Sequence, residues 1–194
     1  MATTDPATDK ASPRDRLLEA AGELFYRDGV SVGVEALCRS AGVSKRSMYQ
    51  LFDSKDEMLA ASLERRRSWY EAQLVPAEDA SATPRERIRH VFERLEKSSG
   101  NPEYLGCPYL AVLVELKDPE HPASVVARDA KGRMEGFFRE QAGQGGATDP
   151  AVLARRLMLI FDGASARAGA HIERLDDGLA TGTADALMDA AGMS

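Results

Sequence analysis

Apolar residues recur every three to four positions along most of the chain, which is the spacing of helices that pack through one face. The first such stripe starts after Ser12 and Pro13, a favoured helix cap followed by a favoured first helical residue, and it stops at Asp28 and Gly29. Later stripes are separated by breaks rich in Pro, Gly and Ser, and none shows the alternation of a strand. The pattern predicts an all-α protein of about nine helices, the longest running from 150 to about 174.

Residues 31–55 predict two short helices joined by a tight turn. Gly42 stands where the first helix should end, and a glycine there adopts the left-handed conformation without steric cost. Ser44 follows as a cap for the second helix. Met48 and Phe52 lie four residues apart on one face of that helix, and the opposite face is polar. Such a pair of helices is typical of insertion into a DNA major groove.

The basic residues of this second helix carry the candidate chemistry. Lys45 and Arg46 lie in its first turn, where positive charge opposes the helix dipole, so stability alone does not explain them. Arginine commonly contacts guanine. Glutamine, here Gln50, can pair with adenine. The alternative is an ordinary solvated helix face. Residues 1–70 hold 11 basic and 11 acidic residues and residues 71–194 hold 14 and 20, so the net charge of −6 leaves the N-terminal part neutral.

The same region resembles the TetR family of transcriptional regulators. The matching residues are the apolar first helix 17–25, Gly29, Leu37, Cys38, Ala41 to Ser44, Tyr49, Phe52, Lys55 and Leu59. A looser match covers Gly106 to Tyr109 and Glu115 to Leu116. Gly33 departs from the family pattern, because a capping Ser or Thr is common there. The resemblance implies that Lys55 contacts a DNA phosphate, which completes the predicted DNA-binding set: Ser44, Lys45, Arg46, Ser47, Tyr49, Gln50 and Lys55.

The predicted organisation has three parts. Residues 1–11 are polar and form a disordered tail, residues 12–58 form a helix-turn-helix DNA-binding domain, and residues 59–194 form a helical domain for effector binding and dimerisation. The resemblance implies a repressor that a small apolar ligand releases from a double-stranded DNA operator.

The segment 106–116 predicts a helix that is apolar around most of its circumference, which indicates burial. It fits either a filled core or the wall of a ligand cavity, and the family resemblance favours the cavity. The candidate ligand-binding residues are Trp69, Phe92, Tyr109, Val112, Leu113, Met134, Phe137, Phe138 and His171.

The long helix expected from residue 150 carries an apolar stripe among many small residues. One interpretation is packing within the chain. The family interpretation is that this helix and the last one pair with their copies in a four-helix interface of a homodimer, with two reading helices about one DNA turn apart. The candidate interface residues are Leu153, Leu157, Ile160, Phe161, Ala164, Ala168 and Leu187.

Other chemistry finds little support in the sequence. The three histidines are far apart without metal-ligand spacing, and neither a phosphate-binding loop nor a nucleophile motif occurs, so we expect no metal, no cofactor and no enzyme. Two cysteines, Cys38 and Cys107, are too few for a disulfide framework, and no signal peptide or membrane span is evident, which favours the cytoplasm. The alternatives are a helical carrier or enzyme that keeps a vestigial DNA module, and a protein-interaction adaptor.

Overall fold

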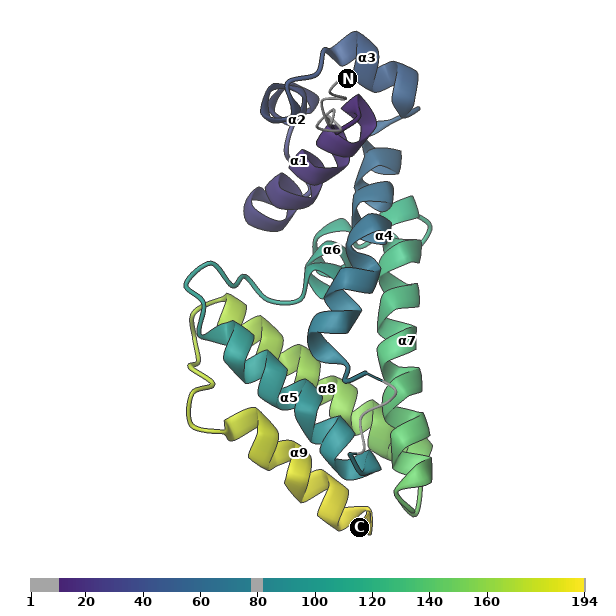
Figure 1. The fold of residues 1–194 in the computed structure, drawn as a ribbon, viewed down its shortest axis with the longest axis vertical. Helices are drawn as coiled ribbons and strands as arrows, with labels where there is room; N and C mark the ends of the chain where they lie inside the picture. The colour runs from purple at the N-terminus through teal and green to yellow at the C-terminus, as the bar shows by residue number, and fades with distance from the viewer. Residues whose placement is uncertain (1–10, 78–81, 194) are drawn as a thin grey trace, which may run out of the picture.

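The computed structural model describes residues 11–77 and 82–193, which form nine α-helices and no strand (Figure 1). The prediction of an all-α protein with about nine helices is confirmed. All but the last residue of the predicted 1–11 tail lie outside the described residues. The helices are α1 Pro13–Asp28, α2 Val34–Ala41, α3 Lys45–Leu51, α4 Lys55–Leu74, α5 Pro84–Ser99, α6 Pro108–Leu116, α7 Pro122–Gln144, α8 Pro150–Gly169 and α9 Leu179–Ala190.

Helix α4 connects two groups of helices. At one end of the molecule α1, α2 and α3 pack on one another, and α1 also packs along α4 (Figure 1). Beyond them α4 packs against α5 and α7, while α8 and α9 complete a bundle with α5. Helix α4 therefore belongs to both groups and connects them.

Capping residues begin helices α1 and α5. The Ser12 hydroxyl accepts a hydrogen bond from the Asp15 amide at 3.1 Å, and Pro13 begins α1. Thr83 and Glu86 form a complete capping box at the start of α5. Each bond satisfies an amide that the helix itself leaves without a partner.

Helix α8 ends at Gly169, five residues earlier than predicted. A Cβ atom on Gly169 would lie 2.4 Å from the carbonyl carbon of Leu105, so the helix end sits directly against the loop before α6. His171 then takes a positive φ of 56°, which turns the chain away from the helix axis. The spacing of apolar residues, from which the helix was expected to reach about residue 174, gives no information on this contact.

The predicted dimer stripe on α8 faces the interior of the chain. Leu153, Leu157, Phe161 and Ala168 are buried by the surrounding helices and cannot contact a second copy. Ile160, Ala164 and Leu187 are half-buried and pack against the same core. For the four buried residues the interface assignment is therefore wrong, and packing within the chain, the other interpretation of this stripe, holds.

Candidate DNA-binding surface and ligand cavity

The turn between α2 and α3 is built as its sequence predicts. Gly42 has the left-handed angles φ 62° and ψ 38°, and the Val43 amide donates back to the Cys38 carbonyl at 3.0 Å. The Ser44 hydroxyl accepts from the Ser47 amide at 3.0 Å and caps α3. Gly33 caps α2 without any side-chain bond, as its departure from the family pattern suggested. The turn fixes the direction in which α3 leaves α2.

Helix α3 has one buried and one exposed face. Met48 and Phe52 are buried, and the guanidinium of Arg14 lies 5.2 Å from the centre of the Phe52 ring. On the opposite face Arg46 and Gln50 are exposed, and Tyr49 is 56% exposed. A large aromatic ring and two long polar side chains thus project from one short helix, as direct contact with base edges and phosphates requires.

The two lysines of the predicted DNA-binding set already have partners within the chain. Lys45 pairs with Glu35 of α2, and their hydrogen bond raises the pKa of Lys45 and lowers the pKa of Glu35. The Lys55 ammonium donates to the carbonyls of Val30 at 2.8 Å and Val32 at 3.4 Å. Lys55 therefore braces the loop before α2, a role that the sequence did not suggest, and two such bonds leave one of its three hydrogens for a phosphate.

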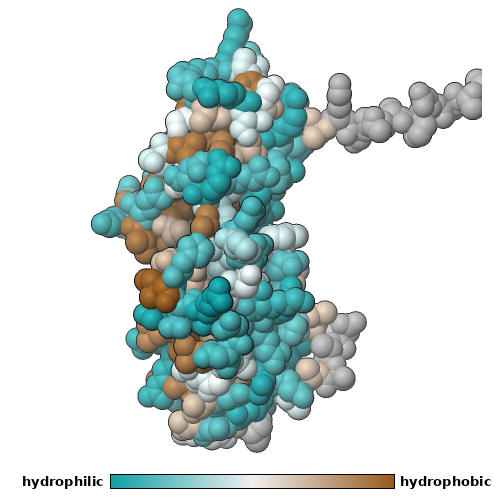
Figure 2. All heavy atoms as spheres, turned by 90° about the vertical axis from the view of Figure 1, so that its left-hand side faces the viewer, coloured by the Kyte–Doolittle hydropathy of each residue, from teal (hydrophilic) through white to brown (hydrophobic). Residues whose placement is uncertain are grey.

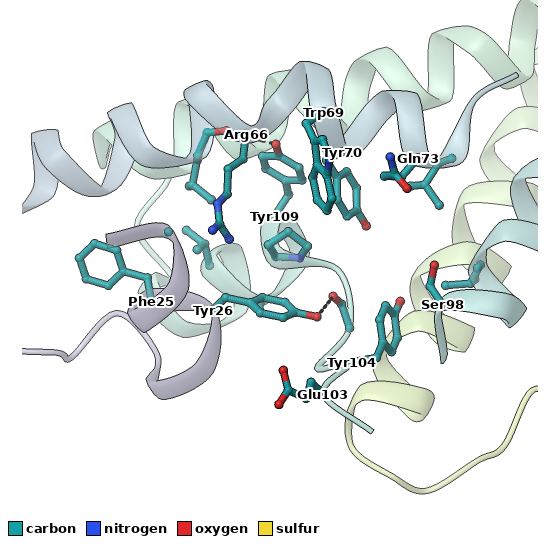
Figure 3. Close-up of a pocket in the computed structure, with 18 of the residues that line it drawn as sticks. Phe25, Tyr26, Arg66, Trp69, Tyr70, Gln73, Ser98, Glu103, Tyr104 and Tyr109 are labelled. Atoms are coloured by element: carbon teal, nitrogen blue, oxygen red, sulfur yellow. Dashed lines mark hydrogen bonds between the residues drawn. The ribbon is translucent and has the colours of Figure 1, made fainter. Parts of the chain in front are cut away.

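A cavity of about 460 Å³ lies between α1, α4, α5, α6 and the loop that precedes α6 (Figure 3). Its volume is in the range of small-molecule sites. Four of the five tyrosines of the chain and its single tryptophan line it. The aromatic residues of the wall are Phe25, Tyr26, Trp69, Tyr70, Tyr104 and Tyr109.

Three of the four tyrosine hydroxyls in the wall are bonded to the protein. The Tyr26 hydroxyl donates to the Gly106 carbonyl at 3.0 Å and accepts from the Leu105 amide at 2.8 Å. The Tyr104 hydroxyl bonds the Ser165 hydroxyl at 2.8 Å, and that of Tyr109 donates to the Leu63 carbonyl at 3.2 Å. Burial raises the pKa of all three phenols, so they stay neutral at physiological pH.

In addition to packing along α4, the end of helix α1 that leads to α2 is attached at two points to α6 and the loop before it. The first is the pair of Tyr26 hydrogen bonds to the loop before α6. The second is Glu115 of α6, whose carboxylate accepts from the Val30 amide at 2.9 Å. A Cβ atom on Gly29, which has φ 83°, would lie 2.9 Å from the same carboxylate. The end of α1 that leads to α2 is therefore held directly by the cavity wall.

The structure brings three of the nine predicted ligand residues to the cavity: Trp69, Tyr109 and Val112. The other six lie outside its lining. Phe92 stacks on Phe138 with ring centres 5.8 Å apart, in a filled core between α5, α7 and α8. His171 is exposed after the end of α8. The assignment to this cavity is corrected for the six residues Phe92, Leu113, Met134, Phe137, Phe138 and His171, because apolar spacing does not separate core from cavity wall.

Sequence reasoning missed Tyr26, Tyr70 and Tyr104. A signal was present, since a tyrosine in place of phenylalanine at a half-buried position normally indicates a partner for its hydroxyl. It pointed to no common site, because the three residues belong to α1, α4 and the loop before α6.

Comparison with known proteins identifies the family to which this architecture belongs. The profile of the tetR family of bacterial regulatory proteins matches residues 17–62. A crystal structure from Streptomyces avermitilis, of a protein assigned to the TetR transcriptional regulators, is 58% identical, with a TM-score of 0.93 over 95% of this chain and 100% of that one. The TetR-family regulator SCO4454 from Streptomyces coelicolor is 25% identical, with a TM-score of 0.84 over 92% and 95% of the two chains.

A curated relative, an uncharacterized HTH-type transcriptional regulator of Mycobacterium tuberculosis, is 38% identical over 52 residues. The match spans 26% of each protein, so the chain aligns with about a quarter of that relative's length. The fold, the capped helix-turn-helix and these similarities define a DNA-binding transcriptional regulator. The chain belongs to the TetR family.

In residues 11–77 and 82–193, no group of three His, Cys, Asp or Glu side chains is arranged to hold a metal ion. Across the same residues, no helix combines the length and the apolar character that crossing a membrane requires.

Proposed function

We propose that this regulator acts as a homodimer in the cytoplasm, where α3 of each copy reads one half of a near-palindromic operator and a small ligand in the cavity releases the DNA. The observation that carries this proposal is the capped, outward-facing α3. Residues 12–58 form the DNA-binding module and residues 59–194 the effector and dimerisation module, and the whole is a regulator rather than an enzyme.

The exposed side chains of α3 suit different roles on DNA. Arg46 makes no hydrogen bond within the described residues and suits a bidentate contact with guanine. Gln50 suits adenine, and Ser44, Ser47 and Tyr49 suit phosphate oxygens at the edge of the groove. Lys45 would exchange Glu35 for a phosphate, which lowers the net gain from that contact.

The dimer proposal uses the outer face of α8, not the stripe predicted from the sequence. Leu159 is 75% exposed, and Val152, Gly163 and Ala166 lie on the same side at intervals of seven, four and three residues. On the face that Figure 2 shows, hydrophobic side chains gather toward the left of the view, while its right-hand part is mostly polar. An exposed apolar row of this kind favours association with a second copy.

Light scattering tests the dimer at micromolar concentration. Leu159→Glu should give a folded monomer that loses high-affinity operator binding. Val125→Glu is the matched control, because Val125 is 50% exposed on α7, and it should stay dimeric. A monomeric parent protein would contradict the proposed two-fold binding.

Selection from random duplex DNA tests the regulator itself. We expect a pseudo-palindrome with half-sites about one helical turn apart, bound with an affinity that falls steeply as salt rises. Arg46→Ala should change the base preference within each half-site. Failure to enrich any sequence, together with ligand binding, would instead support a carrier with a vestigial DNA module.

A further inference from the structure

The cavity concentrates aromatic side chains. Half of the Phe, Tyr and Trp residues of the chain line this one site, although aromatic residues make up 6% of the sequence. Trp69 and Tyr70 come from α4 on one side, and Tyr26 and Tyr104 come from α1 and the loop before α6 on the other (Figure 3). Aromatic rings on opposite walls favour a flat molecule between them, since offset and edge-on ring contacts add to the burial of apolar area.

Trp69 indicates that the wall is incomplete without a ligand. Its side chain is 63% exposed, although it is the largest apolar residue in the chain and lines the cavity. Most of its surface is therefore left uncovered by the described residues. A ligand in the cavity would cover the ring and gain the free energy of burying it.

Of the four tyrosine hydroxyls in the wall, that of Tyr70 is the one left for a ligand. The other three tyrosine hydroxyls are bonded to Gly106, Ser165 and Leu63. Within the described residues no oxygen or nitrogen atom accepts a hydrogen bond from Tyr70, and the neighbouring Cys107 thiol is only a weak partner. Burial raises the pKa of Tyr70, so its hydroxyl remains a neutral donor.

The charges around the cavity favour an uncharged ligand. Arg66 is paired with Glu19 at 3.0 Å, and Arg94 donates to the Gln73 carbonyl at 2.8 Å and to its side-chain oxygen at 3.2 Å. An anion would have to displace these bonds to reach either arginine. For a cation, the three basic residues of the wall, Arg66, Arg94 and Lys97, outnumber its two acidic ones, Glu103 and Glu115. Glu115 is already bonded to the Val30 amide, so burial of a cation there would be costly.

We propose that the cavity binds an uncharged, planar aromatic molecule that carries a hydrogen-bond acceptor, stacked between the α4 and α1 sides and bonded by Tyr70. This inference rests on the proposed function, in which the cavity is the effector site. It names the chemical class of that effector.

Titration calorimetry on the full-length protein without DNA tests the class. The probes are 2-naphthol at pH 7, where it is uncharged, decahydro-2-naphthol, 2-naphthoate and 2-naphthyltrimethylammonium. We expect 2-naphthol to bind about tenfold more tightly than each of the other three. Equal binding of the decahydro compound would overturn the requirement for an aromatic ligand. Equal or tighter binding of either ion would overturn the requirement for an uncharged ligand.

Two matched variants test the donor. Tyr70→Phe should weaken 2-naphthol about three- to tenfold and leave naphthalene unchanged, because one hydrogen bond is lost. Tyr109→Phe removes a hydroxyl from the same wall whose hydrogen is already given to Leu63, so it should not separate the two probes. The same result for both variants would remove Tyr70 from the proposal.

The location and the regulatory role are tested separately. Ala111 is exposed and lines the cavity, so Ala111→Trp should fill it without disturbing the core and abolish 2-naphthol binding. Binding that persists would place the ligand elsewhere. If the protein selects an operator but no probe binds, the ligand class fails and the regulator stands; if 2-naphthol binds but no operator is found, the reverse holds.

Discussion

The DNA-reading face of α3 and the cavity wall differ in how their residues are spaced along the chain. The reading face comes from a single stretch, 44–50, whose caps and buried face are set by neighbours within four residues. The cavity wall comes from four helices and a loop that span residues 22–115. A surface built from one short segment is visible in the sequence, whereas a cavity becomes visible only when the packing is known.

The largest expected effect is on the free energy of unfolding, and it should distinguish the cavity wall from the core residues that the sequence assigned to the same cavity. Phe92→Ala removes a fully buried ring from the contacts with Phe138 and Phe161, and should lower the free energy of unfolding by about 3–5 kcal/mol. Trp69→Ala at the cavity should change it by no more than about 0.5 kcal/mol, since the ring is mostly exposed. Urea denaturation measures both, and similar losses would erase the distinction.

On the DNA side, Arg46→Ala should weaken operator binding by about 1–3 kcal/mol, because a bidentate base contact is lost. Fluorescence anisotropy with a labelled operator measures the change. Arg128→Ala on α7 is the control, since this arginine is also exposed but lies far along the chain from α3. An unchanged affinity and base preference for the Arg46 variant would show that α3 does not read DNA through this residue.

Alkaline pH should affect the cavity wall. Burial raises the pKa of Tyr104 above its ordinary value of 10, so near pH 10 the unfolded chain loses a proton that the folded protein keeps. Stability should therefore be constant up to about pH 9 and then fall by up to about 1.4 kcal/mol per pH unit for each such tyrosine. Tyr104→Phe should make the decline less steep. Denaturation midpoints that stay level from pH 9 to 11 would mean that these phenols are not buried in solution.

The smallest expected effect concerns the coupling between the DNA-reading face of α3 and the cavity wall. Tyr26→Phe removes the bonds to Leu105 and Gly106 and should cost about 1 kcal/mol of stability. It should also reduce the factor by which a cavity ligand weakens operator binding, because Glu115 then provides the remaining hydrogen bond between α6 and the end of α1. The comparison of operator affinity with and without 2-naphthol measures this factor. If the factor is unchanged, coupling runs through α4 alone.

Local signals account for what the sequence predicted well. Glycine at 42 and serine at 44 determine a turn through their own backbone and hydroxyl, and the structure shows both acting in this way. The nine helices follow from apolar spacing and capping residues in the same manner.

Long-range packing accounts for what the sequence did not predict. Phe92 and Tyr104 are both aromatic residues near apolar stripes, yet one fills the core and the other lines the cavity. The inward face of α8 has the spacing expected of either an interface or a core, and only its neighbours in the fold decide between them. The early end of α8 depends on a loop more than sixty residues away in the chain.

The position of α1 in the cavity wall limits how freely this protein can be recombined. Hybrid sensors that join the DNA-reading half of one regulator to the sensing half of another are most simply cut between α3 and α4. In this chain that cut exchanges Gly22, Phe25 and Tyr26 as well, and all three line the cavity. A new reading module would bring its own residues to these positions and alter ligand preference together with operator preference. For the same reason, substitutions on α1 during divergence affect both the packing of the helix-turn-helix and the ligand cavity.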